Sequence, residues 1–294
     1  MTYGFWRRFL PPKQISTDRA HEPAFAHALE RIATLDVRTF AELDKAISRF
    51  RKTMDQSSAS EWLALLILQA PRAAHAQTMM DEHPRGYHDR EKRLYELIDF
   101  NDTYDSVLLK LSQAELIGFA ARLRSEIDTF CEKLYTRGFS EEQFKAIDHG
   151  LSREVAVYRA AHDASMDVLL SSRTDDAFGI DMQVRDPQSG RYVNIDCKTA
   201  SSYYFRLKDM VHSGRLSEAA MALGEQQGWC EIFHRAKRER VQAKIILLRI
   251  DQDDLGEIHD YRFVDERKMM ARLREIIAAR GLDDGRFGVG VTRL

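Results

Sequence analysis

The sequence has few cysteines: Cys131, Cys197 and Cys230 are the only three among its 294 residues. They include no Cys-x-x-Cys pair, and Cys197 falls on the packed face of a predicted strand. The sequence therefore predicts neither a zinc site nor a disulfide framework. A reducing cytoplasm is the expected location.

Long apolar runs and targeting signals are also missing. The longest apolar run, Trp62–Leu68, is far too short to cross a bilayer. Met1–Leu10 lacks the continuous apolar segment and the small-residue cleavage site of a signal peptide. We therefore expect no membrane association.

Neither sign of charge dominates, because the formal net charge at pH 7 is −2 although 31% of the residues are charged. The chain as a whole offers no attraction to phosphate, so any nucleic-acid binding must come from a local basic surface. The hydrophobic content of 44% is enough to bury at least one good core and argues against disorder. Internal repeats and low-complexity segments are absent.

The first half of the chain has the pattern of helices joined by short polar turns. Apolar residues recur there at helical spacing, as in Val37, Phe40, Leu43, Ile47 and Phe50. The best boundary lies between Arg137 and Ser152, so we expect a helical domain over residues 1–150 and a second domain over 151–294. Nothing in the helical domain indicates chemistry. We expect it to be structural or to bind DNA, a protein partner or a second copy of the chain.

The second half alternates between helices and strands. A short helix begins at Ser140, before the boundary. Beyond it the expected elements are a helix at Ser152–Ala164, strands at Met166–Ser171, Gly179–Arg185 and Tyr192–Lys198, a helix at Leu216–Leu223 that resumes near Ile232, and a strand at Val241–Ile250. Their order is α-β-β-β-α-β.

Chemistry concentrates on the strand Tyr192–Lys198. Because alternate side chains of a strand share a face, Asp196 and Lys198 project together, while Val193, Ile195 and Cys197 point into apolar packing. The segment Asp186–Gly190 contains Pro187 and Gly190 and predicts a turn to the preceding strand. That hairpin brings Asp181 beside Asp196 and Lys198, although Asp175 or Asp176 in the preceding loop could take its place.

Asp181 followed by Asp196-x-Lys198 resembles the signature of the PD-(D/E)XK, or restriction-endonuclease-like, nuclease superfamily. Ile180 or Gly179 stands where the name-giving proline would be, and that proline is often absent in the family. Glu154 matches an additional acidic residue that many members place on the helix before the strands. The order of elements supports the resemblance more strongly than the triplet does. The resemblance covers the C-terminal half only.

The resemblance implies a mixed sheet flanked by helices and hydrolysis of DNA phosphodiester bonds, as an endonuclease. Asp181, Asp196, the backbone carbonyl of Cys197 and Glu154 would bind Mg²⁺, with Mn²⁺ as a substitute. Lys198 would orient the attacking water and stabilise developing negative charge. An RNA nuclease and a non-catalytic nucleic-acid-binding or assembly protein on the same scaffold are the alternatives.

Each candidate also has a structural interpretation. The [Asp/Glu]-x-Lys triplet recurs at Glu266-Arg267-Lys268, on a predicted helix where residues two apart do not share a face. Asp196 and Lys198 could form a solvated ion pair on a strand face. Glu154, in the first turn of its expected helix, would also suit the helix dipole without a catalytic duty.

A basic rim is needed to bring the phosphate in, and two stretches could supply it. One comprises Arg235, Lys237, Arg238 and Arg240, and the other is the final amphipathic helix with Arg267, Lys268, Arg272 and Arg274. Both could equally be solvated faces, because Glu239, Glu266 and Glu275 are interleaved with them. Further candidates for contact with nucleic acid follow Lys198 directly: Thr199, Ser201, Ser202, Tyr203 and Tyr204.

Overall fold

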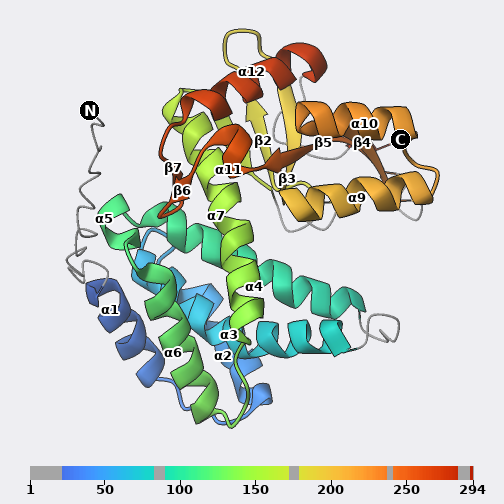
Figure 1. The fold of residues 1–294 in the computed structure, drawn as a ribbon. Helices are drawn as coiled ribbons and strands as arrows, with labels where there is room; N and C mark the ends of the chain where they lie inside the picture. The colour runs from blue at the N-terminus through green and yellow to red at the C-terminus, as the bar shows by residue number, and fades with distance from the viewer. Residues whose placement is uncertain (1–21, 83–89, 172–178, 237–240, 284–291, 294) are drawn as a thin grey trace, which may run out of the picture.

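The computed structural model describes residues 22–82, 90–171, 179–236, 241–283 and 292–293 (Figure 1). The chain is a mixed α/β protein, with a helical N-terminal part followed by a mixed sheet that helices flank. These coarse features confirm the expected fold class.

The helical part packs around one helix. Its elements are α1 (Glu22–Ala33), α2 (Phe40–Thr53), α3 (Ala59–Glu82), α4 (Arg90–Lys110), α5 (Gln113–Leu116), α6 (Phe119–Lys133) and the first half of α7 (Glu141–Asp163). Residues 63–71 of α3 are buried without interruption, because this stretch is apolar on almost every side. Contacts from α1, α2, α4 and α6 surround α3 and form the first core.

The sheet has its strands in the order β1-β2-β3-β5-β4. Their bounds are β1 (Asp167–Leu170), β2 (Met182–Arg185), β3 (Tyr192–Thr199), β4 (Trp229–Ala236) and β5 (Val241–Ile250), and β8 (Thr292–Arg293) pairs with the start of β5. Strands β1, β2 and β3 are antiparallel neighbours, whereas β3 and β5 run parallel. The parallel pair requires a crossover connection, which α9 (Ala200–His212) and α10 (Glu218–Gln227) provide.

Helices cover both faces of this sheet. The second half of α7 and α12 (Arg267–Arg280) pack on one face, where Val193, Ile195 and Leu273 are buried. On the other face, α9 packs against β3 and β5, and α10 packs against β4. The amphipathic character expected of the final helix is confirmed, since one side of α12 is buried: Met269, Met270, Leu273, Ile276 and Ile277.

Helix α7 corrects the expected break between Arg137 and Ser152. The short helix expected at Ser140 and the helix expected at Ser152–Ala164 are one helix that begins at Glu141 and continues to Asp163. The residue pair 150/151, where we expected the domain boundary, lies inside it. Gly150 lies inside this helix, where a glycine costs about 1 kcal/mol of stability relative to alanine. The burial of Phe144 before it and of Leu151 and Val155 after it outweighs that cost.

Two further elements differ from the sequence expectation. Ile232 lies in the edge strand β4 and not in a resumed helix, because its hydrogen-bonding partner is the strongly apolar β5. Residues 200–212 form α9, a helix that the sequence pattern did not predict, with Thr199 as its N-cap. The Thr199 hydroxyl accepts a hydrogen bond from Ser202 N–H at 3.2 Å.

A hairpin from the C-terminal half joins the sheet part to the helical part. After α11 (Gln252–Leu255), strands β6 (Ile258–His259) and β7 (Arg262–Phe263) enclose Asp260 and Tyr261, both with positive φ as a two-residue hairpin turn requires. The ring of Tyr261 is buried in the first core, and its hydroxyl donates to Asp148 of α7 at 2.6 Å. The hydroxyl of Tyr104 from α4 donates to the same carboxylate at 2.9 Å.

Replacing Tyr261 with alanine should therefore destabilise the protein by about 3–5 kcal/mol, the usual cost of removing a buried aromatic ring. Urea unfolding at neutral pH measures this loss. Tyr135→Ala is a matched control, because Tyr135 also has positive φ but its side chain is 97% exposed. The control should change the free energy of unfolding by less than about 0.5 kcal/mol. Equal effects in both variants would contradict the role of the hairpin.

Candidate active site

The hydrogen-bond ladder between β2 and β3 ends next to the candidate site residues Asp181 and Asp196. The last paired residues are Met182 and Ile195, and Asp181 N–H donates to the Ile195 carbonyl at 2.8 Å. Beyond this point the Asp181 side chain takes the place of a backbone acceptor. Its carboxylate Oδ2 accepts a hydrogen bond from Cys197 N–H at 2.6 Å. Asp181 is thereby held against β3, as the sequence pattern predicted.

The alternation along β3 follows the expectation. Val193 and Ile195 are buried between the sheet and α7, with Cys197 packed against the same cluster. Asn194, Asp196 and Lys198 occupy the opposite positions of the strand. Asp196 is only 3% exposed, and the Lys198 ammonium forms an ion pair with its Oδ1. The pair is therefore not a solvated ion pair on a strand surface.

The electrostatics of this group are those of two carboxylates that share a buried site. Burial raises the pKa of Asp196, the neighbouring Asp181 raises it further and Lys198 lowers it, with a result of about 7. Burial also raises the pKa of Asp181, against the opposing effects of Lys198 and of the Cys197 N–H. For Lys198, burial lowers the pKa, but the two carboxylates raise it more, so the ammonium stays charged.

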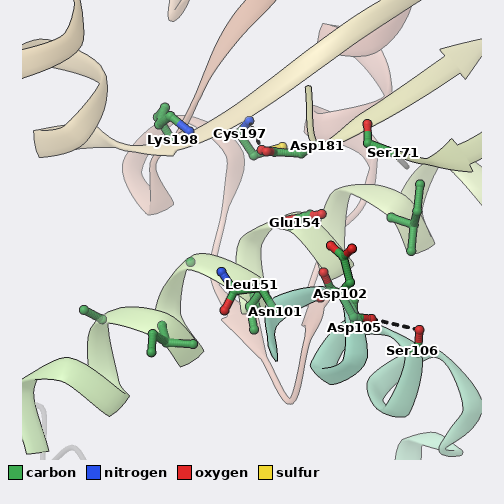
Figure 2. Close-up of a pocket in the computed structure, with 14 residues that line it drawn as sticks. Asn101, Asp102, Asp105, Ser106, Leu151, Glu154, Ser171, Asp181, Cys197 and Lys198 are labelled. Atoms are coloured by element: carbon green, nitrogen blue, oxygen red, sulfur yellow. Dashed lines mark hydrogen bonds between the residues drawn. The ribbon is translucent and has the colours of Figure 1, made fainter. Parts of the chain in front are cut away.

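Glu154 faces this group from α7. It lines a cleft of about 550 Å³ together with Asp181, Cys197 and Lys198 (Figure 2). Its charge contributes to the raised pKa of the Cys197 thiol, after burial and Asp181. Because α7 begins at Glu141, Glu154 lies in the middle of the helix, and the interpretation as a first-turn partner of the helix dipole is wrong.

The opposite wall of the cleft comes from the helical part. Asn101, Asp102, Asp105 and Ser106 of α4 line it, and Figure 2 shows them across the cleft from Asp181 and Lys198. The sequence indicated no chemistry in the helical half, but these α4 residues line the same cleft as Asp181 and Lys198. The sequence does contain a signal, since Asp102 and Asp105 are three residues apart and share a face of α4.

The donor types suit a hard divalent cation. Asp181 and Asp196 are oxygen ligands of the kind that Mg²⁺ takes. Among the residues that the structure describes, no group of three or more Asp, Glu, His or Cys lies close enough to enclose a metal ion. Mg²⁺ does not need such a group, because it is usually bound through one or two carboxylates and keeps several waters. The Cys197 carbonyl and Glu154 remain the further candidate ligands.

The basic stretch before β5 does not border this cleft as far as the structure describes it. Arg235 pairs with Gln242, whereas Lys198 pairs with Arg249 on the same strand. The seven residue steps from Gln242 to Arg249 span roughly 23 Å, so the backbone of Arg235 lies at the far end of β5. Lys237, Arg238 and Arg240 lie outside the described residues.

The other basic candidates are partly engaged in structure. On α12, Arg267 forms an ion pair with Asp265, and Arg272 donates to the Gln227 carbonyl. Tyr203 is buried, and its hydroxyl donates to the Gly224 carbonyl at 2.8 Å, so the expectation that it contacts nucleic acid is wrong. Ser201, Ser202 and Tyr204 are exposed on α9.

Comparisons of the chain with protein-family models, with curated proteins and with solved structures find no match. Among the described helices, none combines the length and apolar character needed to cross a membrane. The three cysteines are free thiols.

The raised pKa of Asp196 gives a testable pH dependence in metal-free buffer. An aspartate titrates near 4 in the unfolded chain, and Asp196 titrates at about 7 in the folded chain. The folded state holds the extra proton between these values, so the free energy of unfolding should fall as the pH rises from about 4 to 7. The expected slope relative to Asp196→Asn is about 1 kcal/mol per pH unit.

Urea unfolding of both proteins between pH 4 and 8 in the presence of a chelator measures this difference. Asp265→Asn is the control, since hydrogen bonds from Arg267 lower the pKa of the exposed Asp265 to about 2. Its difference from the wild type should stay constant from pH 5 upward. A constant difference for Asp196→Asn as well would show that Asp196 is not held protonated by the fold.

Proposed function

We propose that this protein is a metal-dependent nuclease that hydrolyses DNA phosphodiester bonds as an endonuclease. The carrying observation is the pair of Asp181 and Asp196 with Lys198 beside it: Asp196 is buried, and Asp181 and Lys198 line the cleft that opens where the β2–β3 ladder ends. Strongly perturbed carboxylates in a cleft are typical of functional sites.

The charge balance of the cleft supports a cation as cofactor. Asp102, Asp105, Glu154 and Asp181 line it, and Lys198 is the only basic residue among its described lining residues. Such a surface repels a phosphodiester unless a cation joins the two. Mg²⁺ or Mn²⁺, held by Asp181, Asp196 and the Cys197 carbonyl with Glu154 nearby, would polarise the phosphate and lower the pKa of an attacking water.

The protein's own groups have separate tasks in this proposal. The hydrogen bond from Cys197 N–H fixes the orientation of the Asp181 carboxylate. Lys198 is 31% exposed at its side chain, so its ammonium can reach a phosphate oxygen and stabilise the negative charge that develops there. Asp196 holds Lys198 in place through their ion pair.

The connectivity supports a restriction-endonuclease-like core of the PD-(D/E)XK type. The elements α7, β1, β2, β3, α9 and β5 follow the α-β-β-β-α-β order, and α10 and β4 are inserted before the last strand. We propose that the sheet and the helices packed on it form this nuclease part and that α4 of the helical part closes the cleft over it. The free cysteines fit a reducing cytoplasm.

Asp196→Asn should reduce cleavage to background while the fold is retained, because the substitution removes the ligand charge at nearly constant volume. The assay incubates linear, circular and branched DNA, and RNA as a parallel substrate, with Mg²⁺, with Mn²⁺ or with excess chelator. Wild-type protein should cleave DNA with either metal and should be inactive with the chelator. Undiminished cleavage by folded Asp196→Asn, or full activity in chelator, would exclude this site. Cleavage of RNA alone would assign RNA, and not DNA, as the substrate.

Lys198→Ala should lower the single-turnover cleavage rate by roughly two or more orders of magnitude and change DNA affinity little. An interaction that strengthens only in the transition state affects the rate and not the binding. Lys133→Ala is the control, because Lys133 is an exposed lysine on α6 in the helical part. A loss of affinity for Lys198→Ala at an unchanged rate would favour the non-catalytic binding protein.

A further inference from the structure

Helix α9 presents exposed aromatic side chains next to the candidate active site. It begins at Ala200, two residues after Lys198, and Phe205 follows roughly 8 Å along its axis. Phe205 is 67% exposed and Tyr204 is 40% exposed. Their ring centroids lie 6.1 Å apart with the planes inclined by 64°. Large aromatic side chains are rarely left in water in such a pair without a partner.

Basic side chains accompany the two rings. The Lys208 ammonium lies 4.5 Å from the centroid of the Tyr204 ring. Arg206 lies close enough to the active site for its charge to lower the pKa of Asp196. Within the part of the chain that the structure describes, neither Arg206 nor Lys208 forms an ion pair with a carboxylate. Lys208 therefore adds positive charge to the side of α9 that carries the rings, and Arg206 adds it on the side toward the candidate active site.

Space for a flat ring exists beside Phe205. A groove of about 710 Å³ runs between α9 and α10. Its lining residues are Phe205, Lys208, Asp209, Val211 and His212 of α9 and Glu218 and Met221 of α10. The two exposed rings, this groove and Lys208 thus lie along one helix that starts at the site of the proposed chemistry.

We infer that the exposed face of α9 is a stacking platform for unpaired bases, so that the substrate carries a single-stranded segment next to the cleaved phosphate. This inference rests on the proposed nuclease function and specifies its substrate. Bases in a duplex already stack on one another, whereas an unpaired base has a free face for an aromatic ring, and a neighbouring cation binds its phosphate. The start of α9 two residues after Lys198, and the Lys208 ammonium over the Tyr204 ring, favour a nucleic acid bound at the candidate active site over an apolar protein partner as the occupant.

The test measures binding in chelator, where the proposed cleavage does not occur. The probe is a fluorescein-labelled single-stranded 20-mer DNA, and the comparison is the same strand annealed to its complement. Wild-type protein should bind the single strand at least about tenfold more tightly than the duplex. Phe205→Ala and Tyr204→Ala should each weaken single-strand binding by about tenfold, the scale expected when one stacked base is lost.

Two further variants separate stacking from mere apolar contact. Phe205→Leu keeps an apolar side chain without a ring and should bind as weakly as Phe205→Ala, whereas Phe205→Trp should retain wild-type affinity. Phe233→Ala is the control, because Phe233 is 55% exposed on β4 and alternates with Cys230 and Ile232, which face α9 and α10. It should bind both probes like the wild type.

Three results would contradict the stacking platform. They are equal affinity of the wild type for the single strand and the duplex, unchanged single-strand affinity in Phe205→Ala, and a loss of affinity in Phe233→Ala as large as in Phe205→Ala. So would a Phe205-dependent dimer in sedimentation velocity, which would assign the face to a second copy of the chain. Failure of the nuclease proposal gives a different result. In that case the single strand binds through Phe205 but stays uncleaved when Mg²⁺ replaces the chelator.

Discussion

Two neighbouring carboxylates, Asp196 buried and Asp181 partly buried at the cleft, set the requirements for the rest of this structure. Burial raises the pKa of both Asp181 and Asp196, and the neighbouring Asp181 raises the pKa of Asp196 further. Lys198 and the Cys197 N–H offset part of that cost. A fold tolerates such a pair only if surrounding packing is strong, and both faces of β3 supply it through α7 and α12 on one side and α9 on the other. A cation at the cleft would stabilise the ionised form of the same pair.

The helical part belongs to this arrangement and is not a separate appendage. Helix α7 contributes Leu151 and Val155 to the first core. It also contributes Val157 and Ala160 to the core between the sheet and α12, so one helix serves both parts. The hairpin residue Tyr261 ties the sheet part to α4 and α7 through Asp148. Those two helices also line the cleft, with Ile147 and Asp105 next in sequence to Asp148 and Tyr104, so the contact holds α4 and α7 together beside it.

Local patterns predicted the sheet better than the helices. Val241–Ile250 and the face of β3 were predictable because continuous apolar runs and period-two alternation leave few alternatives. The approach of Asp181 to β3 followed from a hairpin with a clear turn. Helix α9 was not predicted, because Thr199, Ser201 and Ser202 form a polar stretch that is typical of a loop. The structure shows that Thr199 is the N-cap of a helix that begins at Ala200. The shared helix face of Asp102 and Asp105 is visible in the sequence, but its position opposite Asp181 depends on long-range packing, which no local pattern shows.

The most direct test is to locate a metal ion at the carboxylate pair. Crystals of the protein soaked in Mn²⁺ at pH 8, where Asp196 is ionised, should show an anomalous difference peak about 2.1–2.2 Å from oxygens of both Asp181 and Asp196, close to the Mg²⁺–oxygen distance. The peak should be absent from Asp196→Asn crystals soaked in the same way. A peak that bypasses both carboxylates, or an equal peak in the Asp196→Asn crystals, would contradict the assignment of the active site.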